Sequence, residues 1–263
     1  MVRIGAHEVD ELHSQVDAEL LLAGAVGEEV ALFVQSPDAD GPRTVELVLE
    51  RARGEVVEHA VVELKGGRKL LHVVLRRFAS ESGEAVKRAV DKRKRVLGDQ
   101  LAAIVIDVRG NPGGEVSQAL VVADMFVGDG VLTRTRGRGG RILREELAHA
   151  AGTDTTTPLV VLQDRHSASA SELLAAALQD HGRAKVVGER SYGKGTVQEV
   201  LGLPDGSVAT FTIARYFSPK DRAIDGSGVA PDVHVVMTPK IPRVGAQDDG
   251  LRAAIDALGL AAK

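Results

Sequence analysis

The hydrophobic pattern near the N-terminus is a series of short runs. Up to about residue 75, apolar positions form short strands and one short helix, at Val2–Ile4, Asp17–Leu22, Val30–Val34 and Val45–Leu49. The segment Ser36–Pro42 is rich in Pro, Asp and Gly, which predicts the loop of a hairpin. This pattern predicts a small α+β module with too little apolar surface to form a convincing independent domain.

Beyond about residue 70, the pattern changes to apolar strands that alternate with longer helices. Apolar residues recur at helical spacing in helices that begin near Ser82 (a candidate N-cap), near Val116 and at Ser169. Such alternation predicts an α/β core with parallel strands and right-handed crossovers. Ala103–Val108 and Leu159–Leu162 have the largely apolar composition of buried strands. Leu70–Leu75 and Ala184–Gly188 are the further strands predicted in this core.

Composition and charge exclude several classes of function. The 263 residues suit one large domain or a core with a smaller partner, and 33 basic against 37 acidic residues give a net charge of −4. That balance lacks the basic footprint of a nucleic-acid binder. The longest apolar run, Leu20–Val26, is too short to span a membrane, and no export signal follows Met1. The absence of cysteine excludes disulfides, thiolate metal sites and a cysteine nucleophile.

Three loops that follow apolar strands carry the candidate chemistry, because α/β proteins place their sites where loops leave the carboxyl ends of strands. Arg109–Gly114 is glycine-rich, so it is either a purely structural turn or a set of backbone amides that face a ligand. Asp164–Glu172 places serines at a helix N-terminus. There a serine is either a plain N-cap or a nucleophile beside an oxyanion hole.

The third loop, Gly188–Thr196, holds a lysine between two glycines. Gly188, Gly193 and Lys194 match part of a phosphate-binding loop, but Gly195 stands where that loop needs Ser or Thr. The residues that follow favour a strand, so the nucleotide-binding hypothesis fails. A lysine among apolar strands, where its charge is disfavoured, can instead act as the general base that a serine nucleophile needs.

Two further features are weaker candidates. His166, with Asp164 or Asp180 as its orienting partner, is the alternative base, but we expect it to point away because it precedes the serines within a turn. The segment Arg134–Arg144 is rich in Gly and Arg, and we predict a solvated hairpin there rather than a site for a polyanion.

Together the three loops resemble those of the C-terminal processing peptidases, which include the tail-specific proteases. The resemblance covers about residues 70–237 and continues through Ala214–Pro219 and Gly226–Asp232, with the motifs in family order. It implies a serine endopeptidase with a Ser/Lys dyad on a crotonase-like α/β core, which cleaves proteins at or near unstructured C-terminal regions. The motifs are Arg-Gly-Asn-Pro-Gly-Gly, Ser-Ala-Ser-Ala-Ser-Glu, Ala-Leu-Gln-Asp-His-Gly-Arg-Ala and Gly-Lys-Gly-Thr-Val-Gln.

The resemblance also implies roles for individual residues. Ser169 matches the nucleophile, Lys194 matches the general base, and Gln198 matches the residue that orients the lysine. The amide of Ala170 and a glycine amide of the turn at Gly113 and Gly114 match the oxyanion hole.

Further implications of the resemblance concern support and partners. Asp180 matches a supporting position, more structural than chemical, and no metal or organic cofactor is implied. The expected partner is a protein or peptide substrate and not a nucleic acid, and oligomerisation is left open. The resemblance implies a periplasmic or otherwise extracytoplasmic location, although this chain shows no signal peptide.

The first segment resembles the second half of a PDZ domain, through Ile4–Val9, Asp17–Leu22 and Gly27–Val34. The first half, with the glycine-rich loop that grips a substrate's terminal carboxylate, has no counterpart, so we expect an N-terminally truncated module. The predicted organisation is a partial PDZ-like module over residues 1–55, a peptidase core over 56–240 and a helical C-terminal tail over 241–263.

Two other functions stay open at this point. A non-proteolytic peptide-binding module results if the missing half-domain leaves the site unassembled. A crotonase-type acyl-CoA enzyme shares the core architecture, but it needs acidic catalysts and a CoA pocket and has no use for Ser169 together with Lys194. Residual hydrolysis in Ser169→Ala would separate these classes.

Overall fold

The chain divides into two compact units, Met1–Glu55 and Val56–Lys263. The computed structural model describes residues 3–9, 22, 24–35, 41–49, 55–202, 208–237, 244–245 and 248–262. The predicted helix at Asp17–Leu22 and the predicted hairpin loop at Ser36–Pro42 fall almost entirely outside the described residues.

The N-terminal unit contains one antiparallel sheet with the strand order β2-β1-β3-β4. Its strands are β1 (Arg3–Ile4), β2 (His7–Glu8), β3 (Glu29–Val34) and β4 (Arg43–Val48). Among the described residues of this unit, Ile4 is the one fully buried side chain.

The larger unit is built on a mixed six-stranded sheet. The chain adds each new strand beside the previous one, and all neighbours pair in parallel except the first two. In spatial order the strands are β5 (Val57–Glu63), β6 (Lys69–Leu75), β7 (Leu101–Asp107), β10 (Leu159–Gln163), β11 (Lys185–Gly188) and β14 (Val233–His234).

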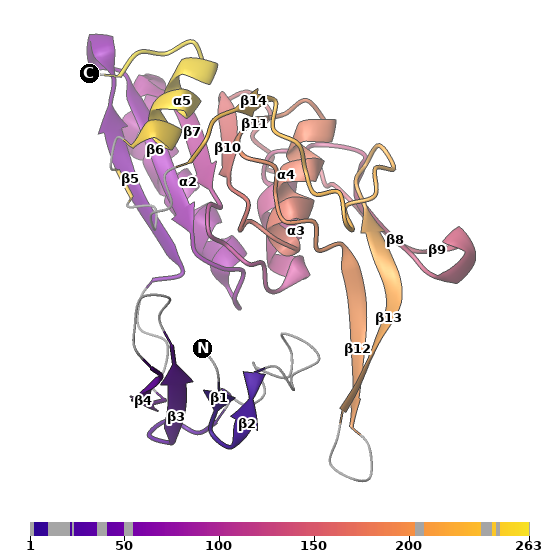
Figure 1. Cartoon of the computed structure of the whole chain (residues 1–263). Coiled ribbons are helices and arrows are strands. Elements are labelled where there is room, and N and C mark those ends of the chain that lie inside the picture. Colours follow the sequence, from indigo (N-terminus) through magenta and orange to yellow (C-terminus); the bar gives the residue numbers. More distant parts are fainter. Residues whose placement is uncertain are drawn as a thin grey trace. The chain divides into compact units, whose positions relative to one another are not determined.

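Helices cover both faces of this sheet (Figure 1). Right-handed crossovers that all advance in one direction place their helices on one face. Alternate side chains of β7 therefore enter different cores: Ile104 and Ile106 pack with the crossover helices, and Ala103 and Val105 pack with the C-terminal helix. The crossover helices are α2 (Ser82–Leu97), α3 (Val116–Asp124) and α4 (Ala170–Asp180), and the C-terminal helix is α5 (Asp249–Ala257).

The start of α2 differs in detail from the sequence prediction. Ser82 is not the N-cap of α2 but its first residue, and Glu81 takes the cap position with a φ of 65°. The Ser82 side chain is buried, and the neighbouring Gly83 amide donates to Gln118 of α3 at 2.9 Å, so packing against α3 sets this helix start. The C-terminal segment contains the helix α5, which packs against β10 and β11 within the same compact unit.

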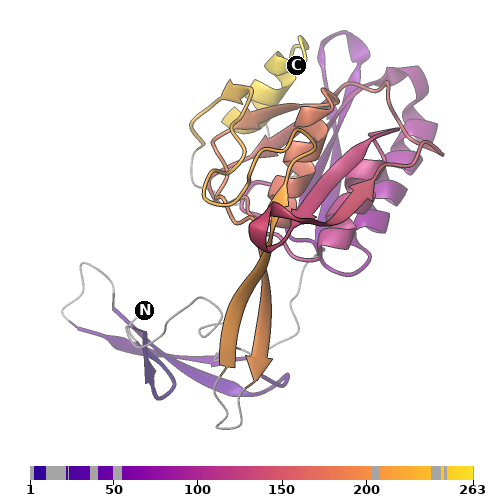
Figure 2. The same ribbon diagram turned by 90° about the vertical axis from the view of Figure 1, so that its right-hand side faces the viewer.

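A second sheet extends from this core with the order β12-β13-β8-β9. Its antiparallel strands are β8 (Val131–Arg136), β9 (Ile142–Leu147), β12 (Thr196–Gly202) and β13 (Val208–Phe217). Figure 2 shows β12 and β13 as a long two-stranded arm, and the basic segment Arg134–Arg144 forms the β8–β9 hairpin that the sequence predicts. In the part of the chain that the structure describes, no helix has the length and apolar character needed to cross a membrane.

Candidate active site

The three predicted loops leave adjacent parallel strands at one edge of the six-stranded sheet. The Ala168 amide donates to the Asn111 carbonyl at 3.0 Å, and the Tyr192 amide donates to the Ser167 carbonyl at 3.0 Å, so the loops are bonded directly to one another. They are Arg109–Gly114 after β7, Asp164–Ser169 after β10 and Glu189–Gly195 after β11.

The serine cluster resolves into two structural serines and one accessible serine. The Ser167 hydroxyl donates to the Val108 carbonyl at 2.8 Å, and the Ser171 hydroxyl donates to the Asn111 carbonyl at 3.1 Å. Both of these serines are buried, whereas Ser169 is half-buried. Ser169 is therefore the serine of the three that a substrate can reach.

Ser169 occupies a strained turn immediately before α4. Its φ of 55° and ψ of −115° lie in a region that costs a residue with a side chain about 1–3 kcal/mol. Gly113 passes so close that a Cβ added to it would lie 2.8 Å from the Ser169 Cβ. A strained serine between a buried strand and a helix N-terminus is the arrangement found where a nucleophile is held out toward substrate.

Glu172 connects the serine loop to the lysine loop. This carboxylate is fully buried, and its Oε1 accepts from the Ser191 hydroxyl at 2.5 Å and from the Gly193 amide at 2.7 Å. Its Oε2 accepts from the Ser169 amide at 2.7 Å and from the Lys194 amide at 2.9 Å. The backbone nitrogens of the candidate nucleophile and the candidate base therefore share one acceptor atom.

The sequence reasoning did not identify Glu172 as a functional residue. Ser169 and Glu172 have the S-x-x-E spacing of a capping box, in which the glutamate accepts from the cap amide. The spacing of Ser169 and Glu172 therefore predicts the hydrogen bond between the Ser169 amide and the Glu172 carboxylate. The hydrogen bonds from the Glu189–Gly195 loop to Glu172 cannot be predicted from local sequence, because they depend on where the tertiary fold places β11.

Lys194 is exposed, which corrects the prediction that it lies among apolar strands. The physical reason is that β11 ends at Gly188, so the lysine loop leaves the sheet before Lys194. Backbone packing fixes the loop instead, since a Cβ on Gly195 would overlap the Asp225 amide. Across the described ranges, no hydrogen bond joins the side chains of Ser169, Lys194 and Gln198.

Gln198 is exposed on β12, where it lies opposite Thr212 of β13. A β-bulge between Val197 and Gln198 shifts the register of this pairing. The sequence prediction counted strand repeats from Lys194, but β12 begins only at Thr196, so Lys194 lies outside the strand. The extra residue of the bulge is Ile213 of β13, which changes the residue that faces Gln198 but leaves the alternation along β12 intact.

The candidate oxyanion donors differ in availability. The Ala170 amide is at the first position of α4, where an N–H has no acceptor within the helix. The Gly113 amide donates to Oδ1 of the buried Asn111 at 2.9 Å. Gly114 forms a bridge with Phe78 and approaches it so closely that a Cβ would overlap the Phe78 carbonyl oxygen. The Ala170 amide is thus free of a helical acceptor, whereas the Gly113 amide must give up its hydrogen bond to Asn111 before it can donate to a substrate oxygen.

The structure does not bring Asp180 or His166 to Ser169. Asp180 is the last residue of α4, and its carboxylate accepts from Arg222 at 2.5 Å and from the Lys220 amide at 2.9 Å. The Asp180 carboxylate is thus engaged in an ion pair at the C-terminal end of α4. His166 is exposed, and its Nε2 accepts from Nε of the adjacent Arg165 at 3.3 Å.

A buried ionic network supports the first loop. Asp107 accepts from His72 Nε2 at 3.0 Å and from Arg109 Nε at 2.9 Å, and Arg109 also pairs with Asp248 at 3.0 Å. The His72 Nδ1 accepts from the Gly245 amide at 3.0 Å, so the ring donates to Asp107 from Nε2. The network joins the start of the glycine-rich loop to the N-cap of α5.

Both charges in this network are stabilised by their partners. Burial tends to raise the pKa of Asp107, but hydrogen bonds from His72 and Arg109 hold that pKa below its usual range. Burial likewise tends to lower the pKa of Arg109, but Asp107 and Asp248 raise it above its usual range. The sequence reasoning missed this network, although a charged pair at the end of an apolar strand signals a supported site.

Among the described residues, no group of three or more His, Cys, Asp or Glu side chains is arranged to hold a metal ion. The residues brought together are instead a serine, a lysine, a buried carboxylate and backbone amides. This set can perform nucleophilic acyl transfer.

Several relatives of known name match most of this chain. A carboxy-terminal-processing protease of Bartonella bacilliformis is 33% identical over 214 residues, which cover 81% of this chain and 48% of that protein. The chloroplastic carboxyl-terminal-processing peptidase 2 of Arabidopsis thaliana is 37% identical over 223 residues, which cover 82% of this chain and 42% of that protein. The chain spans about half the length of the curated relatives it matches.

The fold agrees with these relatives. The structure of the photosystem II D1 C-terminal processing protease matches with a TM-score of 0.74 at 32% identity, covering 89% of this chain and 62% of that chain. Residues 69–235 match peptidase family S41. Because that match spans more than half of the chain and contains all three loops, the chain belongs to peptidase family S41.

Proposed function

We propose that this chain carries the catalytic core of a serine endopeptidase that cleaves proteins at or near their unstructured C-terminal regions. The observation that carries the proposal is the carboxylate of Glu172, whose Oε2 accepts from the amides of both Ser169 and Lys194. This arrangement holds the nucleophile loop beside the base loop. The relatives named as carboxyl-terminal-processing proteases support the class of substrate.

The proposed reaction uses Ser169 as nucleophile and Lys194 as general base. The neutral amine of Lys194 takes the Ser169 hydroxyl proton as Oγ attacks the scissile carbonyl, and it then gives the proton to the leaving amine. The same amine activates the water that hydrolyses the acyl-enzyme. A polypeptide bound over the exposed lysine would remove the amine from water, which favours the neutral form.

Backbone amides and Gln198 complete the proposed machinery. The Ala170 amide donates to the developing oxyanion, and the Gly113 amide joins it when substrate oxygen replaces Asn111 Oδ1, with Gly114 completing the turn. Gln198 orients the lysine amine once substrate is bound. Asp180 serves only the packing of α4, through Arg222.

The proposal extends to the remaining parts of the chain. The core is crotonase-like, and the antiparallel sheet of residues 1–55 belongs to a PDZ-like module that binds polypeptide. The working compartment is extracytoplasmic, or lumenal as in organelles, since relatives include chloroplastic peptidases.

The test is hydrolysis of casein by Ser169→Ala and Lys194→Ala, with Ser167→Ala as the matched control. We expect both dyad variants to lose at least about 10⁴-fold in rate, because catalytic groups act as a unit. Ser167→Ala should keep its activity and lose thermal stability, since its buried hydroxyl bonds the Val108 carbonyl. If Ser169→Ala stayed active while Ser167→Ala lost activity, the assignment of Ser169 as the nucleophile would be wrong. Wild-type binding of casein without hydrolysis would favour a peptide-binding module.

A further inference from the structure

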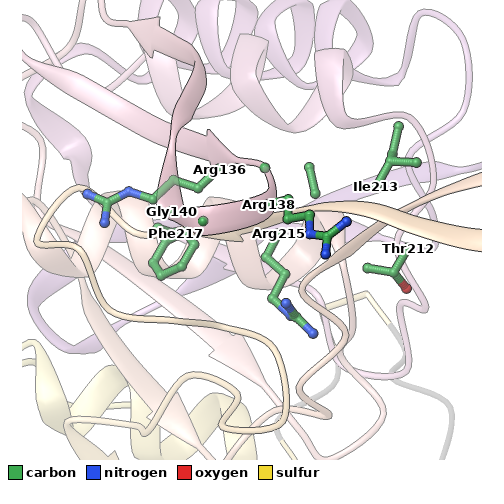
Figure 3. Close-up of a pocket in the computed structure, with 10 residues that line it drawn as sticks. Arg136, Arg138, Gly140, Thr212, Ile213, Arg215 and Phe217 are labelled. Atoms are coloured by element: carbon green, nitrogen blue, oxygen red, sulfur yellow. The ribbon is translucent and has the colours of Figure 1, made fainter.

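A basic pocket lies between the β8–β9 turn and β13, on the second sheet (Figure 3). It has a volume of about 400 Å³, and glycines of the turn form part of its wall. Three arginines line it, Arg136, Arg138 and Arg215, together with Thr212 and Ile213. Figure 3 shows Arg138 and Arg215 extending on the same side, whereas Arg136 extends away from them along Phe217.

The arginines of this pocket differ in how far they are neutralised. Arg136 pairs with Asp221 at 2.8 Å. Arg215 pairs with Asp225 through Nε at 2.9 Å, and its side chain is 58% exposed. Arg138 is exposed and forms no ion pair with any residue that the structure describes. Arg138 and Arg215 therefore present guanidinium N–H groups that can bind an anion.

The pocket adjoins the loop that carries the candidate base. Arg215 lies opposite Thr196, two residues after Lys194, and Thr212 lies opposite Gln198. Residues that lie opposite each other in an antiparallel pair project from the same face of the sheet. An extended polypeptide spans roughly 3.3 Å per residue. If it passes Lys194 and continues along β12 and β13, it therefore reaches the pocket within a few residues.

We propose that this pocket binds a carboxylate of the polypeptide substrate, through Arg138 and Arg215, and sets a preference for acidic substrates. The inference rests on the proposed endopeptidase function and names its substrate chemistry. A guanidinium fork matches a carboxylate in bidentate geometry, which gives position as well as affinity. Ile213, 47% exposed at the pocket wall, offers an apolar contact to neighbouring substrate residues. The carboxylate comes from the chain terminus or from an Asp or Glu side chain.

The test compares kcat/KM of the full chain on four fluorogenic peptides of one sequence. The peptides combine a glutamate or a glutamine near the cleaved bond with a free or an amidated C-terminus. We expect the loss of one of the two carboxylates to lower kcat/KM about tenfold, which identifies the source. Arg138→Gln should lower kcat/KM by a similar factor on the preferred peptide and leave the peptide without that carboxylate unaffected. Arg141→Gln, a neighbouring exposed arginine outside the pocket, should match the wild type.

Peptide binding to Ser169→Ala separates this inference from the proposed function. Carboxylate-dependent binding that Arg138→Gln weakens, without hydrolysis by the wild type, would support the pocket and contradict the peptidase. Hydrolysis of all four peptides at equal rates, unaffected by Arg138→Gln, would support the peptidase and overturn the pocket. Equal effects of Arg138→Gln and Arg141→Gln would also overturn it, because they would show general charge attraction.

Discussion

The serine side and the lysine side of the candidate active site are held in different ways. Ser169 lies in a turn fixed by Glu172 and Asn111, both fully buried, whereas the side chains of Lys194 and Gln198 are exposed. The candidate nucleophile is therefore positioned by the fold itself. The lysine backbone is equally well fixed through Glu172, but its side chain depends on what binds over it.

Strain explains why the serine side needs so much support. The positive φ of Ser169 costs about 1–3 kcal/mol. Hydrogen bonds to a charged acceptor such as Glu172 contribute about 1.5–3 kcal/mol each, enough to hold the turn. An exposed lysine needs no such compensation, since water solvates its charge. The comparison predicts large structural penalties on the serine side and purely catalytic penalties on the lysine side.

The largest expected effect is that of Lys194→Arg. A guanidinium keeps its proton, so this variant should lose at least about 10⁴-fold in kcat without a change in Tm, because the side chain is exposed. An active arginine variant would contradict the general-base role.

Glu172→Gln should follow, with a loss of about 10²–10³-fold in kcat and a clearly lower Tm. A glutamine amide replaces one of the two acceptor oxygens with an N–H donor. That donor faces either the amides of Ser169 and Lys194 or the donors of Ser191 and Gly193, so two buried hydrogen bonds are lost. Glu199→Gln is the matched control, because Glu199 is exposed on β12. Wild-type kcat and Tm in Glu172→Gln would show that this carboxylate does not organise the site.

The sequence predicts those parts of the core that depend on local pattern. The apolar run Leu70–Leu75 is confirmed as part of β6, and Ala103–Val108 overlaps β7. Strands covered on both faces leave an unbroken apolar signal, and glycine-rich turns mark their ends. Local pattern places a group of serines at a helix N-terminus, but it is the resemblance to the processing peptidases that selects Ser169 among them, and this role stays a prediction.

The remaining features depend on contacts between distant residues. His72 and Asp107 are 35 residues apart, and Glu172 and Lys194 are 22 apart, so no periodicity reveals either pair. The exposure of Lys194 follows from the point where β11 ends, and the partner of Gln198 across the sheet follows from a bulge at Ile213 of β13. These are properties of pairing between strands, which a single sequence does not display.

Asp107→Asn tests how much the buried ion pair of Asp107 and Arg109, which supports the glycine-rich loop beside Ser169, contributes to thermal stability. Removing one partner of a buried ion pair costs about 3–5 kcal/mol, which corresponds to a Tm lower by about 10 °C. Because the pKa of Asp107 is lowered by folding, its stabilisation is complete above the unfolded value of about 3.9 and is lost as pH falls below it. Thermal denaturation between pH 7 and pH 3 should therefore show a smaller loss of Tm in Asp107→Asn than in the wild type. Equal slopes would contradict the role of this carboxylate.

The smallest expected effect is that of Gln198→Ala. The side chain is exposed and makes no hydrogen bond with Ser169 or Lys194 in the described structure, so the Tm should stay unchanged. If Gln198 orients the lysine amine only when polypeptide is bound, kcat should fall about tenfold with little change in KM, since one hydrogen bond present in the transition state is lost. Glu199→Ala, one residue further along β12, is the control and should match the wild type. A rise in KM with unchanged kcat would instead make Gln198 a substrate-binding residue, and unchanged values of both would remove it from the site.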